Sequence, residues 1–546
     1  MQILHPMKGA TMFRLLCCLL FVFQLTAVTA SADGRPFRGS THWSVLLCKF
    51  SDAGTPPDTV DHYRNMFLNP GTGGLADYWN AVSDGSLNFS GSVVKGWYTM
   101  GVTKAQALAQ DRWARVDDCV NAAKTAASDA YTVPSGHRLA VITYPDIDMF
   151  GWNGGAFLPY NVDVGGMAHE GGHGISLNHS FSDDPTYKNA DWAAIGEYDD
   201  PWDVMSWGNA FRVPTPFGDG PVGLNGFHLD RMGWLPRSRI MTFGADGVAN
   251  KAVTLAALYH PTAAGPLLVR VPFDPSDLNH FYTVEFRRKD GWNGGIPQDI
   301  VMIHEVMRRS DNVYYSFLLR ERTGSRNPVQ TLNANGVSIQ VNSISSATNQ
   351  ATVTIASQMV DRCLQGYVWR EAQPSDHVCV TPPVRQETKN ENGLAASRRN
   401  PNGGPYGPDT CKQGFVWREA YAGDHVCVPV ASRTRAAQDN AAASARRNPA
   451  RMAYGPNTCK PGFVWREADD KDWVCVTPAI RTQAKNDNAQ AGTRRQPGGG
   501  PYGPDTCKQG FVWREAFPGD HVCVVPPTRT QARQDNIDAS NRLQYQ

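Results

Sequence analysis

The sequence predicts a protein of the α+β class built in three parts, and three observations support this prediction. Strand-like and helix-like signals are mixed in residues 40–237. Short β-branched and aromatic runs separated by turn residues fill residues 238–358, which is typical of an all-β sandwich. Residues 359–546 contain four copies of a cysteine-containing unit with a period of 48 residues. A chain of 546 residues is long enough for this arrangement.

Residues 1–32 have the features of a secretory signal peptide. Lys8 and Arg14 precede the apolar run Leu15–Val28, and the small residues at 30–32 suit cleavage. The apolar run is short for a membrane span, although a retained anchor stays open as an alternative. No later segment of the sequence approaches the length of a membrane span. We therefore expect a secreted, extracellular protein with no membrane span after signal cleavage.

The most informative segment is residues 169–179, which read H-E-x-x-H followed by a further histidine. His169 and His173 are one helical turn apart, so both imidazoles lie on one face and can reach one ion. Glu170 lies beside them, where a carboxylate can hold and deprotonate a water molecule. His179 can reach the same ion only if the chain leaves the helix after His173. Three protein nitrogens with one open position are typical of a catalytic zinc site.

The sequence on both sides of this segment extends the pattern. The apolar run Leu139–Tyr144 predicts a buried strand upstream, and Met205 follows a turn-rich loop downstream. The whole arrangement resembles the metzincin zinc peptidases, most closely those of the gametolysin and immune inhibitor A type. The resemblance covers roughly residues 43–235 and includes the segments Phe50–Asp52, Gly74–Trp79, Gly96–Tyr98 and Gly226–Leu235.

The resemblance implies a role for each residue of the motif. His169, His173 and His179 become the ligands of one Zn²⁺, Glu170 the general base, and Met205 the methionine of the turn beneath the metal. The implied activity is that of a zinc-dependent endopeptidase acting on proteins or peptides. Zinc would activate a water molecule, and Glu170 would take its proton and pass it to the leaving amine.

Two positions depart from the pattern of the family. Ser176 stands where the family usually carries a glycine that bends the backbone towards the third ligand. Gly174 and Asn178 both tolerate left-handed conformations, and we expect them to make the bend instead. Trp207 stands two residues after Met205, where some metzincins have a tyrosine near the metal, so we expect no tyrosine ligand.

Two other functional interpretations stay open. The chain is either an adhesin that binds a surface or carbohydrate and keeps an inactive metzincin scaffold, or a zinc enzyme that acts on a non-peptide amide or ester. The net charge gives no support to nucleic-acid binding, because 52 basic and 51 acidic residues leave no large excess of positive charge.

The cysteine count favours disulfide bonds. Two of the 12 cysteines lie in the predicted signal peptide, and the other ten form an even set in a secreted context. Cys48 lies in the strand-like run Trp43–Phe50, and a disulfide with Cys119 is a simpler explanation than a thiolate that blocks zinc. The remaining candidates form one pair in each repeat, namely Cys363 and Cys379, Cys411 and Cys427, Cys459 and Cys475, and Cys507 and Cys523.

The middle part has strand signals but no further ligand spacing. We expect strands at residues 267–271, 281–286, 300–304, 313–319, 337–341 and 351–355. His260, His280 and His304 are scattered among these runs, and we interpret them as structural. Seven carboxylates precede Met205, at Asp183, Asp184, Asp191, Glu197, Asp199, Asp200 and Asp203. They either bind Ca²⁺ or form a solvated acidic loop, because no calcium-loop spacing is present.

Each repeat contains a phrase such as Gly414–Ala420, a second cysteine, a polar helix-like stretch and a Gly/Pro-rich joint. We expect one intra-repeat disulfide per unit, since so small a unit buries little core. Zinc binding by the cysteines is disfavoured, because the third repeat has Trp473 where the others have His377, His425 and His521.

The tryptophan of each repeat has two interpretations. It either forms the small core of its unit, packed on the disulfide, or it stacks on sugar rings. In the second case the repeats attach the protein to a cell wall or polysaccharide and gain avidity from their number. These residues are Trp369, Trp417, Trp465 and Trp513.

Overall fold

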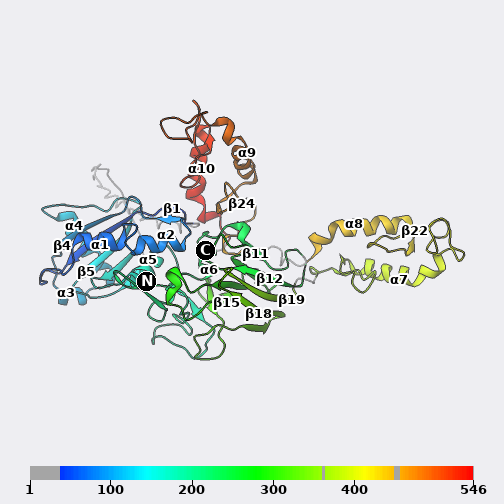
Figure 1. The fold of residues 1–546 in the computed structure, drawn as a ribbon, viewed down its shortest axis with the longest axis horizontal. Helices are drawn as coiled ribbons and strands as arrows, with labels where there is room; N and C mark the ends of the chain where they lie inside the picture. The colour runs from blue at the N-terminus through cyan, green and yellow to red at the C-terminus, as the bar shows by residue number, and fades with distance from the viewer. Residues whose placement is uncertain (1–36, 247, 360–362, 448–454, 545–546) are drawn as a thin grey trace, which may run out of the picture.

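The computed structural model describes residues 37–246, 248–359, 363–447 and 455–544. The predicted signal peptide lies outside the described residues. The protein is mixed α+β, as predicted, with a main body from which two helical units project in different directions (Figure 1). No helix among the described residues is both long and apolar enough to cross a membrane.

A five-stranded sheet forms the centre of the N-terminal part. Its order is β4 (Val93–Thr99), β2 (Trp43–Lys49), β5 (Arg138–Tyr144), β7 (Gly155–Pro159) and β6 (Phe150–Trp152). The first four strands are parallel, and β6 runs antiparallel to β7 at the edge. β2 and β5 are the two predicted buried strands, and both have near-continuous apolar sequences because the sheet is covered on both faces.

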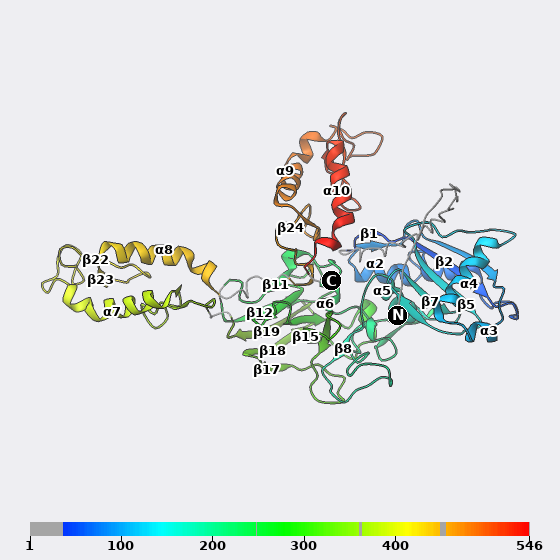
Figure 2. The ribbon, with the colours of Figure 1, turned by 180° about the vertical axis from the view of Figure 1, so that it is seen from behind.

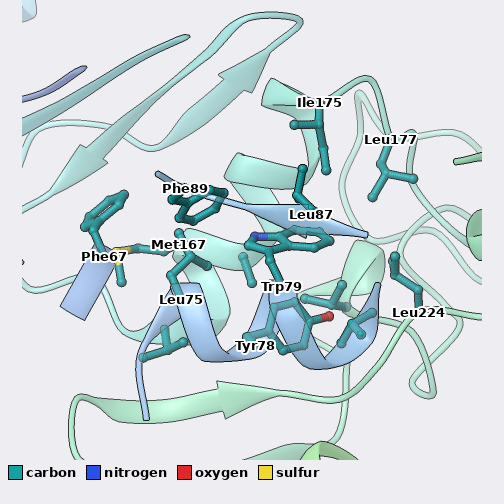
Figure 3. Packing of buried hydrophobic residues seen from close by; sticks show 14 of the residues in the cluster. Phe67, Leu75, Tyr78, Trp79, Leu87, Phe89, Met167, Ile175, Leu177 and Leu224 are labelled. Atoms are coloured by element: carbon teal, nitrogen blue, oxygen red, sulfur yellow. The ribbon is translucent and has the colours of Figure 1, made fainter. Parts of the chain in front are cut away.

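Three helices cover one face of this sheet. They are α1 (Val60–Phe67), α2 (Leu75–Val82) and α5 (Val164–Gly174), and they share one apolar core with the strands. Trp79 lies at the centre of this core, with the methionine that precedes the H-E-x-x-H motif, Met167, beside it (Figure 3). The packing of α2 against α5 fixes the position of the motif.

The other face of the sheet carries α3 (Lys104–Leu108) and α4 (Arg112–Thr125) over a second apolar cluster. The predicted Cys48–Cys119 disulfide is present and joins β2 to α4 within this cluster. Cys48 is fully buried and therefore has no access to the motif on the opposite face. Smaller elements complete this part: β1 (Gly39–Ser40), β3 (Leu87–Asn88), β9 (Arg212–Thr215), β10 (Gly218–Pro221), α6 (Gly226–Arg231) and the short 3-10 helices η1 (Val204–Ser206) and η2 (Arg237–Arg239).

Two sheets pack face to face in the middle part around a shared apolar core. The six-stranded sheet has the order β11 (Ile240–Thr242), β13 (Leu268–Pro272), β14 (Phe281–Arg287), β15 (Ile300–Arg308), β16 (Tyr314–Leu318) and β8 (Phe181–Ser182). The four-stranded sheet has the order β12 (Asn250–Ala256), β19 (Gln350–Ser357), β18 (Val337–Ser345) and β17 (Thr331–Ala334). A 3-10 helix, η3 (Gly291–Gly295), follows β14.

Strand β8 crosses the boundary expected at residue 238. It comes from the loop after His179, yet it pairs in parallel with β16, so that Phe181 lies opposite Phe317. The loop between His179 and Met205 is therefore anchored on the β-sandwich.

Each C-terminal repeat is a short hairpin followed by a helix, and a disulfide closes the segment that contains the hairpin. The predicted disulfides are all present: Cys363–Cys379, Cys411–Cys427, Cys459–Cys475 and Cys507–Cys523. The hairpins are β20 (Val368–Trp369) with β21 (Cys379–Val380), β22 (Val416–Trp417) with β23 (Cys427–Val428), β24 (Val464–Trp465) with β25 (Cys475–Val476), and β26 (Val512–Trp513) with β27 (Cys523–Val524). The helices are α7 (Pro382–Arg398), α8 (Val430–Arg446), α9 (Pro478–Arg494) and α10 (Pro526–Asp538), and η5 (Gly455–Asn457) and η6 (Ser540–Arg542) flank the second half.

The repeats are not independent units. They form two closed pairs, residues 363–447 and 459–543, in which the chain ends are bridged at Cys363–Arg447 and Cys459–Leu543. In the first pair, Arg370 donates to the carbonyl of Ala420 in the second repeat. Arg418 reaches back to Glu391 in the first repeat. Pairing lets each unit bury groups that a single unit of this size leaves in solvent.

The core of each repeat is an ion pair and not the tryptophan. Arg370, Arg418, Arg466 and Arg514 are fully buried, each with a nearby aspartate. Arg418, for example, binds both carboxylate oxygens of Asp424, at 2.8 and 3.2 Å. Trp417 is only half-buried and stacks on His425. Of the two interpretations of the tryptophan, the one in which it forms the core of its unit does not hold, because the adjacent arginine and aspartate fill that place and satisfy each other inside the unit.

The two pairs differ in their contact with the body. The first pair extends away from it, whereas the second lies against it (Figures 1 and 2). In the third repeat, buried Trp473 donates from its indole to Leu235 O. Asp469 of the same repeat binds Arg38, and Lys471 binds Asp84. These side chains replace those of the other repeats, which explains why Trp473 departs from the internal pattern.

Candidate metal centre

Helix α5 presents the H-E-x-x-H motif and is held in place by close packing. The side chain of Asp163 caps its first turn by accepting from Gly166 N at 2.8 Å. Glycine is a poor helix former, but a Cβ at Gly172 would lie 2.6 Å from Met205 Sδ. A Cβ at Gly174 would likewise lie 2.4 Å from the ring of Trp43. The glycines allow neighbouring elements to approach the helix directly.

The structure brings together the three histidines that the sequence singled out. His169 and His173 project from α5, and His179 comes from the loop beyond it. Candidate ligand atoms from the three rings all lie within 4.8 Å of one another. Among the described residues, no other group of three or more histidine, cysteine or acidic side chains meets this criterion.

Each imidazole is oriented by a protein acceptor at its Nδ1 atom. His169 Nδ1 lies 3.0 Å from Val204 O, and His173 Nδ1 lies 2.8 Å from Leu177 O. His179 Nδ1 lies 2.6 Å from Glu197 Oε1. An Nδ1 atom that donates to oxygen leaves Nε2 as an unprotonated acceptor, which is the form that binds a metal.

The arrangement of the Nε2 atoms fits a cation. His173 Nε2 and His179 Nε2 are 3.0 Å apart. With protons on both Nδ1 atoms, two lone pairs would face each other at this distance, and a shared cation removes the repulsion. Burial lowers the pKa of His169 strongly and that of His173 to about 3, so both rings are neutral at physiological pH. Three imidazoles suit Zn²⁺.

The bend that delivers His179 is made by Ser176 itself. This residue has a φ of 70°, in the left-handed region, whereas neither Gly174 nor Asn178 has a positive φ. The prediction that these two residues would replace the family's glycine was therefore wrong. The turn is closed by Leu177 N, which donates to Gly172 O at 2.9 Å. Because this hydrogen bond closes the turn tightly, Ser176 is the residue that adopts the left-handed conformation.

Glu170 is buried beside the histidines under strand β6. The amide of Gly151 in β6 donates to its carboxylate, and a Cβ at Gly151 would lie 2.9 Å from Glu170 Oε2. Burial raises the pKa of Glu170 to about 8. A carboxyl group with this basicity, oriented by a backbone amide, suits proton transfer near neutral pH.

The sequence analysis missed the functional position of two residues. Glu197 orients His179, and it also accepts from Ala194 N at 2.8 Å. Burial opposes ionisation of Glu197, but the hydrogen bonds from His179 and Ala194 lower its pKa overall. Glu197 was counted only as one of the seven carboxylates, because spacing alone does not identify a partner 18 residues away.

Tyr198 is the second missed residue. Its ring lies 3.9 Å from that of His179, centre to centre, and its backbone is left-handed with a φ of 64°. Burial and the nearby carboxylates of Glu197 and Glu170 raise the pKa of Tyr198, so its hydroxyl remains a proton donor. Tyr198 lies before Met205 in the sequence, and no motif identified a functional residue in that segment.

Met205 lies directly beneath the helix. It is fully buried in η1, and the preceding residue, Val204, supplies the carbonyl that orients His169. Asp203 caps η1 by accepting from Met205 N at 2.7 Å and binds buried His228 at 3.0 Å. The turn is therefore fixed by buried polar contacts on both sides.

The acidic loop makes mostly internal contacts. Six of its seven carboxylates accept hydrogen bonds from the protein; these are Asp183, Asp184, Glu197, Asp199, Asp200 and Asp203. Asp200 binds His304, the predicted structural histidine, at 3.1 Å. Calcium binding by this loop stays a prediction.

Comparisons with known proteins give only distant likenesses. No family model and no curated protein matches the chain. Among solved structures, wild-type OgpA from Akkermansia muciniphila aligns with a TM-score of 0.26 and 14% identity, covering 59% of this chain and 97% of OgpA. A catalytically inactive OgpA in complex with an O-glycopeptide substrate, glycodrosocin, aligns with a TM-score of 0.23 and 11% identity, covering 53% and 96%. Likeness at this level carries no argument about this chain.

Proposed function

We propose that the protein is a secreted zinc-dependent endopeptidase of the metzincin type. One observation carries the proposal: all three imidazoles have their Nδ1 atoms oriented by protein acceptors while their Nε2 atoms converge. A common ligand of the Nε2 atoms accounts for this order, because ligating histidines donate their other ring nitrogen to a protein acceptor. Bound zinc would supply Lewis acidity and make water a nucleophile at neutral pH.

The remaining chemistry belongs to side chains of the chain. Glu170 accepts the proton of the attacking water and passes it to the leaving amine, and Gly151 N keeps its carboxylate in position. Tyr198 stands beside His179 with a protonated hydroxyl that can donate to the developing oxyanion. Glu197 holds His179 in one tautomer.

The surroundings of the site suit an extended peptide. β6 is an edge strand above Glu170, and its free side offers backbone groups with which a substrate strand can pair. The exposed side chain of Trp192 lies edge-on to Tyr198, with ring centres 6.1 Å apart. We infer that Trp192 contacts an apolar side chain of the substrate.

The disulfides support an extracellular location. All ten cysteines of the described residues are paired, and such bonds persist in oxidising compartments. Secretion therefore agrees with the composition of the signal-like N-terminal segment.

Hydrolysis of casein by the secreted protein tests the proposal. We expect the wild type to cleave casein with one zinc per chain, and Glu170→Gln to retain zinc but lose cleavage by a factor of about 100 or more. Glu321→Gln is the matched control, since it removes the same charge from an exposed side chain. Chelator treatment should abolish cleavage, and added zinc should restore it.

Two outcomes would replace the proposal. Stoichiometric zinc without cleavage of casein or a mixed peptide library, but with hydrolysis of simple esters or acyl amides, would favour a non-peptide substrate. Absence of zinc and of all hydrolysis would favour an adhesin with an inactive scaffold.

A further inference from the structure

The second and fourth repeats share a segment that is identical residue for residue. Residues 404–420 and 500–516 have the same sequence, whereas the corresponding part of the third repeat differs at several positions. Each copy exposes one tyrosine, Tyr406 with 73% and Tyr502 with 74% of its surface in solvent. Packing does not require a large aromatic side chain at so exposed a position, so its presence in both copies needs another explanation.

Hydrogen bonds fix the backbone of the loops that carry these tyrosines. Gly404 and Gly407 exchange two backbone hydrogen bonds, and Gly500 and Gly503 do the same in the other copy. Tyr406 N donates to Thr410 Oγ1 at 3.2 Å, and Tyr502 N donates to the equivalent threonine at the same distance. A loop with a fixed backbone loses less conformational entropy when a ligand binds.

Each tyrosine belongs to a group of three rings. The ring of Tyr406 lies edge-on to Trp417 with centres 5.9 Å apart, and Trp417 stacks on His425 at 4.1 Å. In the fourth repeat the same distances are 6.0 Å for Tyr502 and Trp513, and 4.1 Å for Trp513 and His521. We call these groups the aromatic platforms.

Polar groups surround each platform. Trp417 Nε1 donates to Asp409 O at 2.8 Å, which fixes the indole, and His425 Nδ1 lies 3.0 Å from Asp409 Oδ2. The aspartate, histidine and tyrosine are all partly exposed, so their polar atoms remain accessible at the edge of the rings. Asp505 and His521 repeat the arrangement in the other copy.

We propose that the two aromatic platforms bind the sugar rings of a polysaccharide. A pyranose ring offers an apolar C–H face that packs on an aromatic side chain and a hydroxyl rim that hydrogen-bonds to carboxylate, imidazole and phenol groups. Two identical platforms on one chain match a repetitive polymer, because such a ligand presents the same epitope many times and rewards simultaneous binding.

The other two repeats lack the platform. In the third repeat Trp473 replaces the stacked histidine and is buried against Leu235, while Asn457 replaces the aspartate and donates to Asp230 O at 2.5 Å. The first repeat has no tyrosine loop before its first cysteine. Each pair thus contains one platform repeat, and the third repeat attaches the second pair to the body.

The fourth-repeat platform has additional polar neighbours. A cavity of about 660 Å³ opens between the second pair and the N-terminal part of the body, and Trp513, His521, Thr41 and Arg138 are among the residues that line it. Arg138 Nε donates to Gly174 O at 2.6 Å, and no carboxylate of the described residues forms an ion pair with its guanidinium. This cavity extends the platform into a site for more than one sugar unit.

Retention on polysaccharides tests the proposal independently of peptidase activity. Glu170→Gln protein would be applied to cellulose, chitin, xylan, mannan, β-1,3-glucan and hyaluronan. We expect retention by at least one of them. Tyr406→Ala and Tyr502→Ala should each weaken it at least about tenfold, and the double variant should abolish it. Leu394→Ala, which removes an exposed apolar side chain from α7 of the first pair, is the matched control and should change nothing.

The outcomes separate this proposal from the peptidase proposal. Retention by none of the six polymers would overturn it, as would a double variant that is retained like the wild type. Arg138→Gln should weaken binding of Tyr406→Ala protein, whose remaining platform borders the cavity, more than that of Tyr502→Ala protein. Circular dichroism of each variant would show whether the repeats remain folded. The tyrosine variants, made in protein that keeps Glu170, should cleave casein as the wild type does.

Discussion

Replacing Ser176 by glycine should stabilise the protein, although it removes side-chain atoms from the metal centre. Ser176 has a φ of 70°, and its hydroxyl is buried without a hydrogen-bond partner among the described residues. A left-handed conformation costs an L-residue about 1–2 kcal/mol, and an unpaired buried hydroxyl costs about 1 kcal/mol or more. Glycine removes both costs but adds about 0.5–1 kcal/mol of backbone entropy to the unfolded chain. The net gain should be about 1–2 kcal/mol.

Ser180→Gly is the matched control for this substitution. Ser180 lies four residues further on, is buried, and also has a hydroxyl without a partner, but it does not have a positive φ. It shares the hydroxyl and entropy contributions and lacks the left-handed one. We expect Ser180→Gly to be close to neutral or slightly stabilising.

Thermal and urea unfolding of the zinc-free protein, followed by tryptophan fluorescence, would measure the difference between the two variants. The transition that contains the helix α5 region should move to higher denaturant in Ser176→Gly and not in Ser180→Gly. Equal effects of the two substitutions would refute the reasoning, because the left-handed backbone would then contribute nothing.

Three other substitutions have defined outcomes. Glu197→Gln should weaken zinc binding by about 10–100-fold in competition with a chelator, since the amide orients His179 less well than the carboxylate does; an unchanged affinity would remove Glu197 from the site. Gly151→Ala should lower kcat, because the added Cβ would lie 2.7 Å from both Glu170 O and His173 Cβ and 2.9 Å from Glu170 Oε2; normal turnover would show that β6 moves to accommodate the Cβ. Trp473→His, which installs the residue of the other repeats, should release the second pair from the body and raise the radius of gyration in X-ray scattering, whereas the same radius would mean that Asp469 and Lys471 suffice.

The fold class and the main strands were predictable because buried strands have continuous apolar sequences. The runs at 43–50 and 139–144 are continuous apolar segments, and they form β2 and β5 of a sheet covered on both faces. The helix end after His173 was predictable for a different reason, since the third histidine requires it. The residue that makes the bend was not predictable, because Ser176 adopts its conformation under the constraint of the Leu177 to Gly172 hydrogen bond.

The arrangement of the repeats could not be predicted from one unit. The period and the cysteines identified the boundaries of the unit and its disulfide, but burial of Arg418 depends on a helix that lies in the preceding repeat. From its sequence neighbours alone, a charged residue is predicted to be exposed to solvent. The same limit applies to Glu197, whose role depends on a histidine brought to it by the turn.

Strand β8 gives the order in which a newly made chain can complete its candidate metal centre. Both histidines of α5 are synthesised well before β16, the strand that pairs with Phe181 and Ser182 just beyond His179. Until residues 314–318 have been made and have joined the sheet, the segment that follows His179 lacks its permanent partner. A nascent or truncated chain therefore carries a two-histidine site with an unfixed third ligand. The candidate metal centre would then be complete only after the β-sandwich has folded.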